Sequence, residues 1–448
     1  MELRDYQKED VIKLTSRNTA GCFNEQRTGK TPTALRAMKK HGCQKILIIC
    51  PASVLYQWQE AYEQWLKEPC VVINGTPAKR QEQLEQWTHG LVISYDTLKT
   101  TKAKTGEWEN ILKHNPEGVI LDECHRIKNP KSAAAQAVFK TIKIPYRIAL
   151  SGTPAPNKPY EIYSTLHWLL PNTFSSYWTF INEYFTTVRR NANGHTFIDI
   201  TSFQPGKRQK LQVILNQIST QRKRADIMPW LPEKDYERVK LEPNREQRRY
   251  LRELKNFFET EGVVTTGILD RLIRYRQICL HPALIGLKGK SPKLEWILQY
   301  IKDYPDKPII IFSKFTSFLK ILEKELNANS FYTIIGSTPI REREKIRKSF
   351  QNGERKILLL NIDAGKEALT LDTAEAIIFT DKYPPVADIQ QAEDRFIATT
   401  ESKANKPHTI IELIMKGTFD EHLYRLIDKR KTETDIINNY KKYLKGGE

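Results

Sequence analysis

Residues 119–125 read Val-Ile-Leu-Asp-Glu-Cys-His, an apolar run that ends in two adjacent acids. A short, continuous run of this kind is typical of a strand in a parallel sheet that is buried on both faces. Acids at the carboxyl end of such a strand suit a site for a nucleotide with its magnesium ion. We predict that Asp122 holds the metal, directly or through water, and that Glu123 orients or deprotonates the attacking water. If no other residues supported a nucleotide site, Asp122 and Glu123 would be better explained as two surface acids at the end of a strand.

Support comes from residues 27–31, Arg-Thr-Gly-Lys-Thr, which precede a predicted apolar helix. A glycine followed by Lys-Thr at a helix start forms an anion cradle, in which backbone N–H groups point at phosphates. There Lys30 bridges the terminal phosphates and the Thr31 hydroxyl holds magnesium. Asn24 replaces the first glycine of the usual pattern, and asparagine tolerates a left-handed backbone better than most residues. The loop and the acid pair together indicate a nucleotide-hydrolysing site. The predicted nucleotide-binding residues of the loop are Arg27, Thr28, Gly29, Lys30 and Thr31.

Similar apolar runs recur in both halves of the chain, separated by helical stretches. In the first half we predict strands at residues 46–50, 71–73, 91–94, 119–121 and 147–150. In the second half we predict them at residues 309–312, 332–335, 357–361, 376–380 and 409–413. Buried strands that alternate with helices indicate parallel sheets, and two such series indicate an α/β protein with two lobes.

The region between the two series has a different pattern. Residues 174–185 carry apolar side chains at helical spacing, which favours core packing over a base-stacking platform. Pro229, Pro232 and Pro243 then punctuate an extended stretch that we predict to be the boundary between the lobes. The predicted parts are a first lobe (1–235) with a helical insertion (about 155–230), and a second lobe (236–448) with a helical start (about 244–300) and a C-terminal helical tail.

The chain is strongly basic, with 71 lysines and arginines against 53 acids and a net charge of +18 over 448 residues. Such an excess usually indicates a polyanion partner, with nucleic acid as the first candidate, although a basic surface also serves solubility. Residues 200–225 contain six basic residues and no acid. This run fits contact with phosphates as well as it fits a solvated face.

Cysteine spacing and hydropathy bear on the compartment. No two of the six cysteines are spaced as Cys-x-x-Cys, and several lie in apolar runs where a thiol packs as a small hydrophobe. We therefore expect neither a disulfide framework nor a zinc site, and a reducing cytosol fits better. The N-terminus has no apolar signal core, and no apolar run approaches the roughly 18 residues of a membrane span. We expect a soluble cytoplasmic protein.

Several further motifs carry a family resemblance. The acid pair with Cys124 and His125, followed by Ser-Gly-Thr-Pro at residues 151–154, resembles motifs II and III of superfamily-two helicases. In detail the chain resembles the Swi/Snf-type DNA-translocating ATPases of that superfamily, in a compact form like that of bacterial or phage members. The match runs over roughly residues 1–415 in the family's order. The other segments that carry it are 3–7 (Leu-Arg-Asp-Tyr-Gln), 48–58, 94–98 (Ser-Tyr-Asp-Thr-Leu), 223–234, 276–284 (Arg-Gln-Ile-Cys-Leu-His-Pro-Ala-Leu), 311–315, 361–371 and 391–395 (Gln-Ala-Glu-Asp-Arg).

The resemblance implies two RecA-like lobes with parallel sheets and helical insertions between them, with ATP and Mg²⁺ held between the lobes and DNA lying across both. It implies that Arg395 stabilises charge on the transferred phosphoryl group. The other nucleotide-site residues that it implies are Gln7, which reads adenine, and Asp363, Gly365 and Gln391. The coupling residues that it implies are Ser151, Gly152 and Thr153. The DNA-contacting residues that it implies are Pro51, Ala52, Ser53, Ser94, Tyr95, Arg222, Lys223, Arg224, Ser313 and Lys314.

Two motifs depart from the family pattern. Lys366 and Ala368 replace two glycines of motif V, and Ile397 and Ala398 replace a histidine and the second arginine of motif VI. Because that arginine normally reaches the γ-phosphate, we expect slower hydrolysis, with Arg395 carrying most of the charge stabilisation.

Three functions follow from the resemblance and its departures. The first is a monomeric, ATP-dependent motor on duplex DNA that acts in replication, recombination or repair. The second is a branch-migrating or annealing helicase at forks and junctions. The third, of another class, is an ATP-gated DNA clamp with little hydrolysis. An RNA helicase fits less well, because the segment at residues 276–284 resembles the DNA branch.

Overall fold

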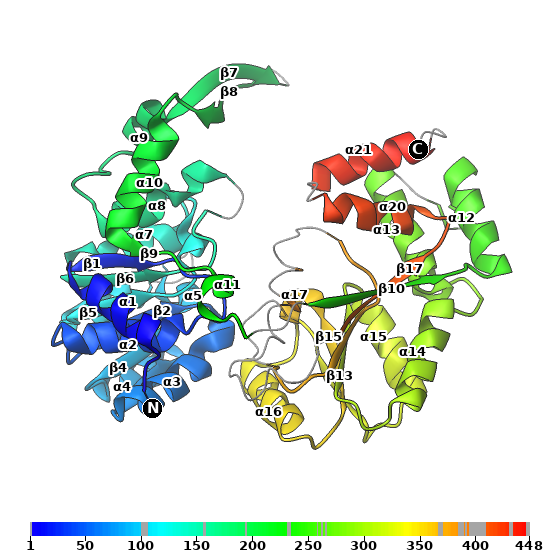
Figure 1. The fold of residues 1–448 in the computed structure, drawn as a ribbon, viewed down its shortest axis with the longest axis horizontal. Helices are drawn as coiled ribbons and strands as arrows, with labels where there is room; N and C mark the ends of the chain where they lie inside the picture. The colour runs from blue at the N-terminus through cyan, green and yellow to red at the C-terminus, as the bar shows by residue number, and fades with distance from the viewer. Residues whose placement is uncertain are drawn as a thin grey trace. The chain divides into compact units, whose positions relative to one another are not determined.

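The computed structural model divides the chain into two compact units, Met1–Pro229 and Trp230–Glu448 (Figure 1). Each unit contains its own parallel sheet, so the predicted α/β class with two parallel-sheet lobes is confirmed. The residues that the structure describes are 2–99, 106–155, 158–192, 195–230, 234–257, 259–260, 263–264, 267–365, 371–383, 389, 392–393, 409–429 and 433–444.

The first unit is built on a seven-stranded sheet of order β3-β4-β2-β5-β6-β1-β9, in which all neighbours are parallel. The five strands predicted in this half are all present. The pattern of apolar runs misses β1, which consists of small residues, and β9, which has only two residues. The strands are β1 (Thr19–Cys22), β2 (Ile46–Cys50), β3 (Cys70–Ile73), β4 (Gly90–Ser94), β5 (Gly118–Leu121), β6 (Tyr146–Leu150) and β9 (Ser219–Thr220).

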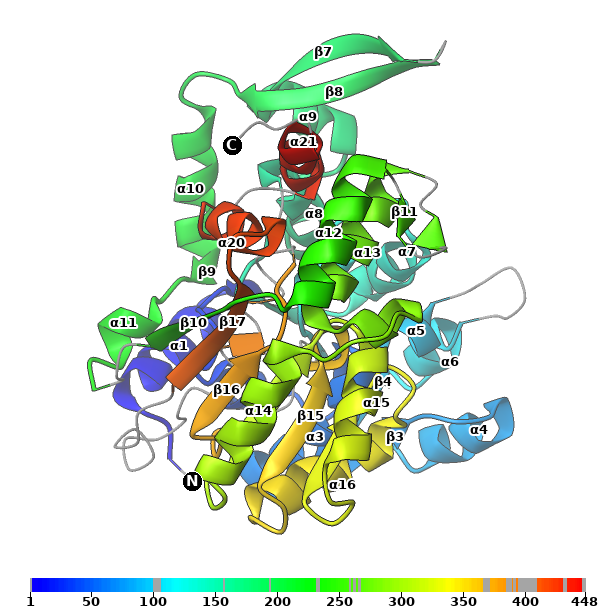
Figure 2. The same ribbon diagram turned by 90° about the vertical axis from the view of Figure 1, so that its right-hand side faces the viewer.

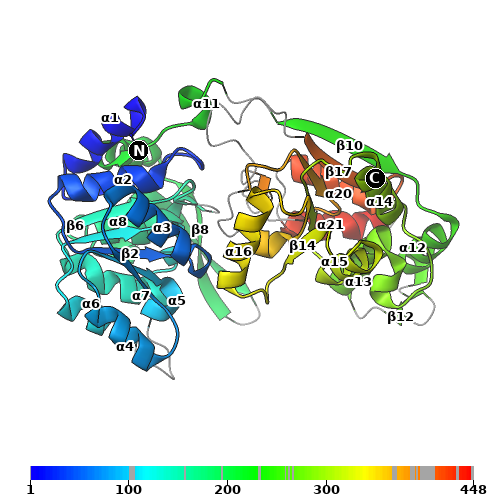
Figure 3. The ribbon, with the colours of Figure 1, turned by 90° about the horizontal axis from the view of Figure 1, so that it is seen from below.

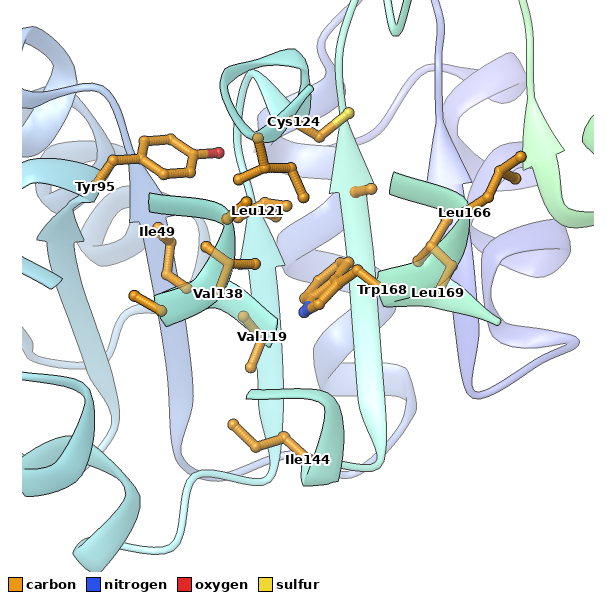
Figure 4. Packing of buried hydrophobic residues seen from close by; sticks show 14 of the residues in the cluster. Ile49, Tyr95, Val119, Leu121, Cys124, Val138, Ile144, Leu166, Trp168 and Leu169 are labelled. Carbon is orange, nitrogen blue, oxygen red and sulfur yellow. The ribbon is translucent and has the colours of Figure 1, made fainter. Parts of the chain in front are cut away.

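Helices cover both faces of this sheet. On one face Val119 and Leu121 of β5 belong to a buried cluster that includes Val138 of α7 and Trp168 of α8 (Figure 4). On the other face α2 lies so close to β5 that a Cβ atom on Gly118 would lie 2.7 Å from the sulfur of Met38, and α1 packs beside α2 (Figure 3). The helices are α1 (Asp5–Thr15), α2 (Lys30–Lys40), α3 (Leu55–Leu66), α4 (Pro77–Glu85), α5 (Tyr95–Leu98), α6 (Trp108–Lys113), α7 (Ala133–Phe139), α8 (Tyr163–Leu169), α9 (Tyr177–Tyr184), α10 (Lys207–Ile218) and α11 (Arg224–Ile227).

The insertion predicted to be helical also contains an antiparallel hairpin of β7 (Phe185–Ala192) and β8 (His195–Phe203). The prediction was wrong here for a physical reason, because both strands are rich in β-branched and aromatic residues. The sequence between them is Asn193-Gly194, which is a strong hairpin signal that the helical interpretation overlooked. The apolar residues at 174–185 are mainly core, as predicted, since Phe174, Ile181 and Phe185 are buried.

The second unit is built on a six-stranded parallel sheet of order β10-β17-β16-β13-β15-β14. Its five predicted strands are present. The sixth, β10, occupies the stretch predicted as the lobe boundary and pairs with β17 from Asp235–Thr409 to Leu241–Met415. Its side chains are mostly exposed, so it lacks the apolar run that marks the others. The strands are β10 (Asp235–Leu241), β13 (Ile309–Ser313), β14 (Phe331–Ile334), β15 (Ile357–Asn361), β16 (Ala376–Phe379) and β17 (Thr409–Met415), with a separate pair β11 (Glu259–Thr260) and β12 (Val263–Val264).

Alternate residues of these strands face two different sets of helices. Ile309 and Ile311 belong to a cluster with α14 and α15, whereas Ile310 and Phe312 belong to one with α13, α20 and α21. Figure 2 shows α14 and α15 in front of the strands. Among the helices described, none is long and apolar enough to cross a bilayer. The helices are α12 (Arg245–Phe257), α13 (Ile268–Leu280), α14 (Pro292–Asp303), α15 (Thr316–Glu325), α16 (Ile340–Gln351), α17 (Ile362–Gly365), α20 (Phe419–Asp428) and α21 (Glu433–Leu444).

A buried ion pair joins three elements of the second unit. Lys293 on α14 donates to Asp420 Oδ2 on α20 at 2.8 Å and to the Thr380 carbonyl, just after β16, at 2.9 Å. The same carboxylate oxygen accepts the backbone N–H of Met415 at 2.9 Å. Both side chains are almost completely buried, so neither charge can turn to water if its partner is removed.

We expect Asp420→Asn to lower the free energy of unfolding of the second unit by about 3–5 kcal/mol, because it leaves the Lys293 ammonium buried without a counter-charge. Urea unfolding of the full chain measures the change. Asp5→Asn is the control, since Asp5 pairs with Lys8 on the exposed side of α1 and its removal should leave the midpoints unchanged. Equal midpoints for the parent and Asp420→Asn would contradict the assignment.

Candidate nucleotide site

The loop between β1 and α2 ends in a turn that favours glycine. Gly29 precedes the first residue of α2 and has left-handed backbone angles of φ 73° and ψ 39°. A Cβ atom at this position would lie 2.1 Å from Nε2 of Gln7. Any other residue would therefore strain the backbone and push the end of the Gln7 side chain aside.

The first helix holds this loop from outside. Gln7 Nε2 donates to the carbonyls of Thr28 and Gly29 at 3.4 Å, and Tyr6 donates its hydroxyl to the Thr28 carbonyl at 3.0 Å. Gln7 Oε1 accepts the Arg4 N–H at 2.9 Å, which fixes the amide orientation. The predicted adenine-reading residue thus lies against the predicted phosphate-binding loop.

The loop curves around the ammonium group of Lys30. Lys30 Nζ donates to the carbonyls of Asn24 and Glu25 at 3.0 Å. The buried Thr28 hydroxyl donates to the Glu25 carbonyl at 2.8 Å, so its side chain braces the loop. Arg27 and Thr31 are both partly exposed beside it. These contacts place the predicted lysine at the centre of the loop.

Asn24 stands where the usual loop has a glycine. We predicted that it does so because asparagine tolerates a left-handed backbone, but the structure shows a different reason. The backbone of Asn24 is not left-handed, whereas Arg27 has a φ of 67°. The buried Asn24 amide instead donates to Asp10 Oδ2 at 2.7 Å and accepts the Arg222 N–H at 3.0 Å. Asn24 is therefore a cross-link between the loop, α1 and the segment after β9.

The three basic residues at 222–224 differ in their contacts. Arg222 donates to Asp10 at 2.7 Å and to Glu9 at 2.8 Å, so its charge is neutralised within the unit. The phosphate contact of Arg222 stays a prediction. Arg224 donates its backbone N–H to the Glu25 carboxylate at 2.8 Å. Lys223 remains exposed.

Asp122 is held by three elements at the carboxyl edge of the sheet. Trp58 on α3 donates its indole N–H to Asp122 Oδ2 at 2.8 Å, and the Glu123 N–H donates to Oδ1 at 3.0 Å. Tyr95 donates its hydroxyl to the Asp122 carbonyl at 2.6 Å. Sequence reasoning missed this role of Trp58, which it took only as the end of the motif segment at residues 48–58.

Electrostatics place Asp122 near the loop. Burial, and after it the Glu123 carboxylate, raises the pKa of Asp122 to about 6. The Trp58 hydrogen bond and the charge of Lys30 act in the opposite direction, so Lys30 lies within electrostatic range of this carboxylate. A bound cation would favour the charged form further.

Glu123 forms a triangle with two residues of neighbouring segments. Its Oε2 lies 3.2 Å from His125 Nδ1 and accepts the Ser151 hydroxyl at 3.4 Å, while His125 Nδ1 lies 3.3 Å from Ser151 Oγ. The Thr153 N–H donates to the Ser151 hydroxyl at 3.1 Å. A Cβ atom on Gly152 would lie 3.1 Å from Gln26 of the loop. The predicted coupling residues therefore join the acid pair to the loop.

Two residues predicted to contact DNA lie in the interior of the first unit. The Ser94 hydroxyl caps α5 by accepting the Thr97 N–H at 3.1 Å, and Tyr95 is buried with its hydroxyl on Asp122. Their side chains support the site, and their contact with DNA stays a prediction. Pro51 is also buried, whereas Ala52 and Ser53 are partly exposed.

The predicted residues of the second unit form local pairs. The buried Ser313 donates its hydroxyl to Asp381 at 2.9 Å, and its contact with DNA stays a prediction. Lys314 donates to both carboxylate oxygens of Asp363 at 2.7 Å. Gly365 ends α17. Gln391 and Arg395 lie outside the described residues.

Glu393, which lies between Gln391 and Arg395 in the sequence, belongs to a buried ionic network. Its carboxylate accepts Lys382 at 2.9 Å, Lys234 at 3.0 Å and the Tyr236 hydroxyl at 2.7 Å. Lys382 also donates to Glu412. Burial alone would raise the pKa of Glu393, but the Lys382 and Lys234 charges hold it below its usual value. The network ties the segment that precedes Arg395 to β10 and β17.

Comparison with protein families gives a consistent result. A family model described as "SNF2-related domain" matches residues 11–284, and one described as "Helicase conserved C-terminal domain" matches residues 292–397. The chain belongs to the SNF2-related family. The family resemblance inferred from the motifs is thereby confirmed, and this SNF2-related chain is a member of a family of helicase-like ATPases.

Among curated proteins, the zebrafish (Danio rerio) chromodomain-helicase-DNA-binding protein 1-like is 26% identical over 98% of this chain and 44% of its own length. The probable ATP-dependent DNA helicase CHR23 of Arabidopsis thaliana is 27% identical over 88% of this chain and 40% of its own length. The SNF2-related chain thus spans about two-fifths of these relatives. A solved Sulfolobus solfataricus SWI2/SNF2 ATPase core in complex with dsDNA is 25% identical, with a TM-score of 0.43, and covers 98% of this chain and 92% of its own.

The donor set fits a magnesium ion bound together with phosphates. Within the part of the chain that the structure describes, no group of three or more His, Cys, Asp or Glu side chains could hold a metal alone. Mg²⁺ usually keeps several waters and takes one or two carboxylates besides substrate phosphates. Asp122 and Thr31 could supply such a site beside Lys30.

We expect Gly29→Ala to weaken ATP binding, because a Cβ atom strains the left-handed backbone of the loop and also pushes the Gln7 amide out of place. Gly42→Ala is the matched control, since Gly42 also has a positive φ (82°) but faces open space. It should cost about 1–2 kcal/mol of stability from backbone strain alone and retain ATP binding. Titration calorimetry with MgATP and thermal unfolding measure the two effects. Normal ATP affinity in Gly29→Ala would contradict the assigned geometry.

Proposed function

We propose that the chain is an ATP-hydrolysing motor on duplex DNA that acts in replication, recombination or repair. The observation that carries this proposal is the convergence, at one sheet edge, of the loop around Lys30 and the Asp122 carboxylate. Membership of the SNF2-related family supports the same activity.

ATP binding would use contacts that the loop already makes. Lys30 exchanges the carbonyls of Asn24 and Glu25 for the terminal phosphates. Gln7 makes only long bonds to the loop, at 3.4 Å, so its Nε2 group can exchange them for adenine while Oε1 keeps the Arg4 N–H. Mg²⁺ on Thr31 and Asp122 would neutralise charge on the phosphates.

Glu123 is the proposed base. Its backbone is left-handed, with φ 46° and ψ 56°, which is costly for a residue with a side chain and must be maintained by its surroundings. Ser151 and His125 contact the carboxylate and fix its orientation. From this position Glu123 can accept a proton from the water that attacks the γ-phosphate.

The same triangle offers a route for coupling. Ser151 bonds both Glu123 and the backbone of Thr153, so a change at Glu123 on phosphate release reaches the segment that follows β6. We propose that this segment transmits the nucleotide state to the DNA-binding surface.

DNA is the proposed track because of the net charge of +18 and the family. Binding through phosphates should weaken steeply with salt. A branch-migrating or annealing helicase at forks is a variant of this function. The second class, an ATP-gated clamp with little hydrolysis, is favoured by Ala398 at the position of an arginine that can be worth about 10³–10⁵ in rate.

Steady-state ATP hydrolysis with no nucleic acid, duplex DNA, single-stranded DNA and RNA tests the proposal. A motor on duplex DNA predicts the largest stimulation by duplex. A clamp predicts ATP-dependent DNA binding without turnover. Equal rates under all four conditions would contradict DNA-dependent hydrolysis, and a higher rate on forked than on linear duplex would favour the fork enzyme.

We expect Glu123→Gln to bind ATP but to hydrolyse it about 10²–10⁴ times more slowly, because it keeps the shape of the side chain and removes the base. Lys30→Ala is the matched comparison and should lose turnover while keeping DNA binding at low salt. Quenched-flow hydrolysis and fluorescent-ATP binding separate the two steps. If Glu123→Gln fails to bind ATP, Glu123 is a structural residue.

A further inference from the structure

An arginine stripe runs along α12 of the second unit, apart from the nucleotide-site motifs. Arg245, Arg248, Arg249 and Arg252 are spaced i, i+3, i+4 and i+7, which places them on one helix face. All four are exposed. Figure 1 shows α12 at the outer edge of its unit.

The opposite face of α12 is firmly attached to the unit. Tyr250, Leu251 and Leu254 are buried in the core. Gln247 donates to the Ile278 carbonyl on α13 at 2.8 Å, and its N–H donates to the Asn244 cap at 2.9 Å. The stripe is therefore held in place facing solvent, rather than carried on a loose segment.

The charges of the stripe are only partly balanced. Arg248 pairs with Glu242 at 3.1 Å and Arg249 with Glu253 at 3.8 Å, and both pairs are largely exposed and hence weak. Arg245 and Arg252 make no ion pair with any residue that the structure describes. Like charges at this spacing oppose helix formation, so Arg245 and Arg252 do not stabilise the helix through each other.

The segment that carries Lys288 and Lys290 is tied to α12 through its backbone. Tyr250 donates its hydroxyl to the Lys288 carbonyl at 3.1 Å, and Asn244 donates its amide to the Lys290 carbonyl at 2.8 Å. These bonds anchor the helix further, and the charged surface itself consists of the four arginines. We name the surface of Arg245, Arg248, Arg249 and Arg252 the α12 basic face.

We propose that the α12 basic face binds the phosphate backbone of duplex DNA. The proposal rests on the proposed function, to which it adds a contact surface in the second unit. A guanidinium fork grips two phosphate oxygens at once. Arg245 and Arg252 are separated by seven residues, about 10 Å along a helix, which is enough for them to contact different phosphates of one duplex, where successive phosphates of a strand rise about 3.4 Å along the DNA axis. Such contacts position the DNA without reading its sequence.

The test compares two double variants that remove the same charge. Arg245→Gln with Arg252→Gln removes the unpaired arginines of the face. Lys320→Gln with Lys324→Gln removes two exposed charges from α15 in the same unit, where neither lysine pairs with a described residue. The affinity of each full-length protein for a fluorescent 30-base-pair duplex is measured over a range of salt concentrations.

We expect the arginine variant to bind duplex more weakly, with the log–log salt slope reduced by about 0.9 for each phosphate that the protein no longer neutralises. The lysine variant should match the parent. Equal slopes for the arginine variant and the parent would overturn the proposal and leave the face to an acidic protein or to solvent. Equal weakening in both variants would also overturn it, because net charge would then explain the weaker binding. A parent that binds no duplex would instead refute the proposed function.

Discussion

A sheet whose strands are all parallel brings the carboxyl ends of its strands to one edge, and the candidate site depends on this constraint. The loop after β1, the acid pair after β5 and the serine after β6 are far apart in sequence but leave adjacent strands of one sheet. The strand order therefore places Lys30, Asp122 and Ser151 near one another in space. The apolar runs on both faces stabilise the sheet, and the polar residues at its edge are held by the chain that follows each strand.

Support for the site comes mainly from residues that do no chemistry. Asp10, Asn24 and Arg222 cross-link α1, the loop and the segment after β9, and Trp58 holds Asp122. Each contact satisfies a buried polar group and fixes an orientation at the same time. In the second unit the Glu393 network and the Lys293–Asp420 pair have the same character, since charges are buried only with partners.

Patterns in the sequence point to the candidate site residues, but they do not point to the hydrogen-bond and ion-pair partners of those residues. The apolar strands and the loop follow from patterns of adjacent residues, which act locally. β10 was not predicted as a strand because an edge strand needs no apolar run, and β7–β8 were missed although Asn193-Gly194 marks a hairpin. In the sequence, Arg222 is one of three consecutive basic residues. Only the fold brings it to Asp10, which is 212 positions away. Long-range polar pairs of this kind leave no periodic signal.

The central claim is that the loop around Lys30 and the Asp122 carboxylate form one MgATP site. A crystal structure of the full chain with ADP, beryllium fluoride and Mg²⁺ tests it most directly. We predict that Lys30 Nζ leaves the carbonyls of Asn24 and Glu25 for phosphate-like fluorides, with Mg²⁺ at Thr31 and Asp122 and the adenine on Gln7. Nucleotide bound elsewhere, with the Lys30 contacts unchanged, would contradict it.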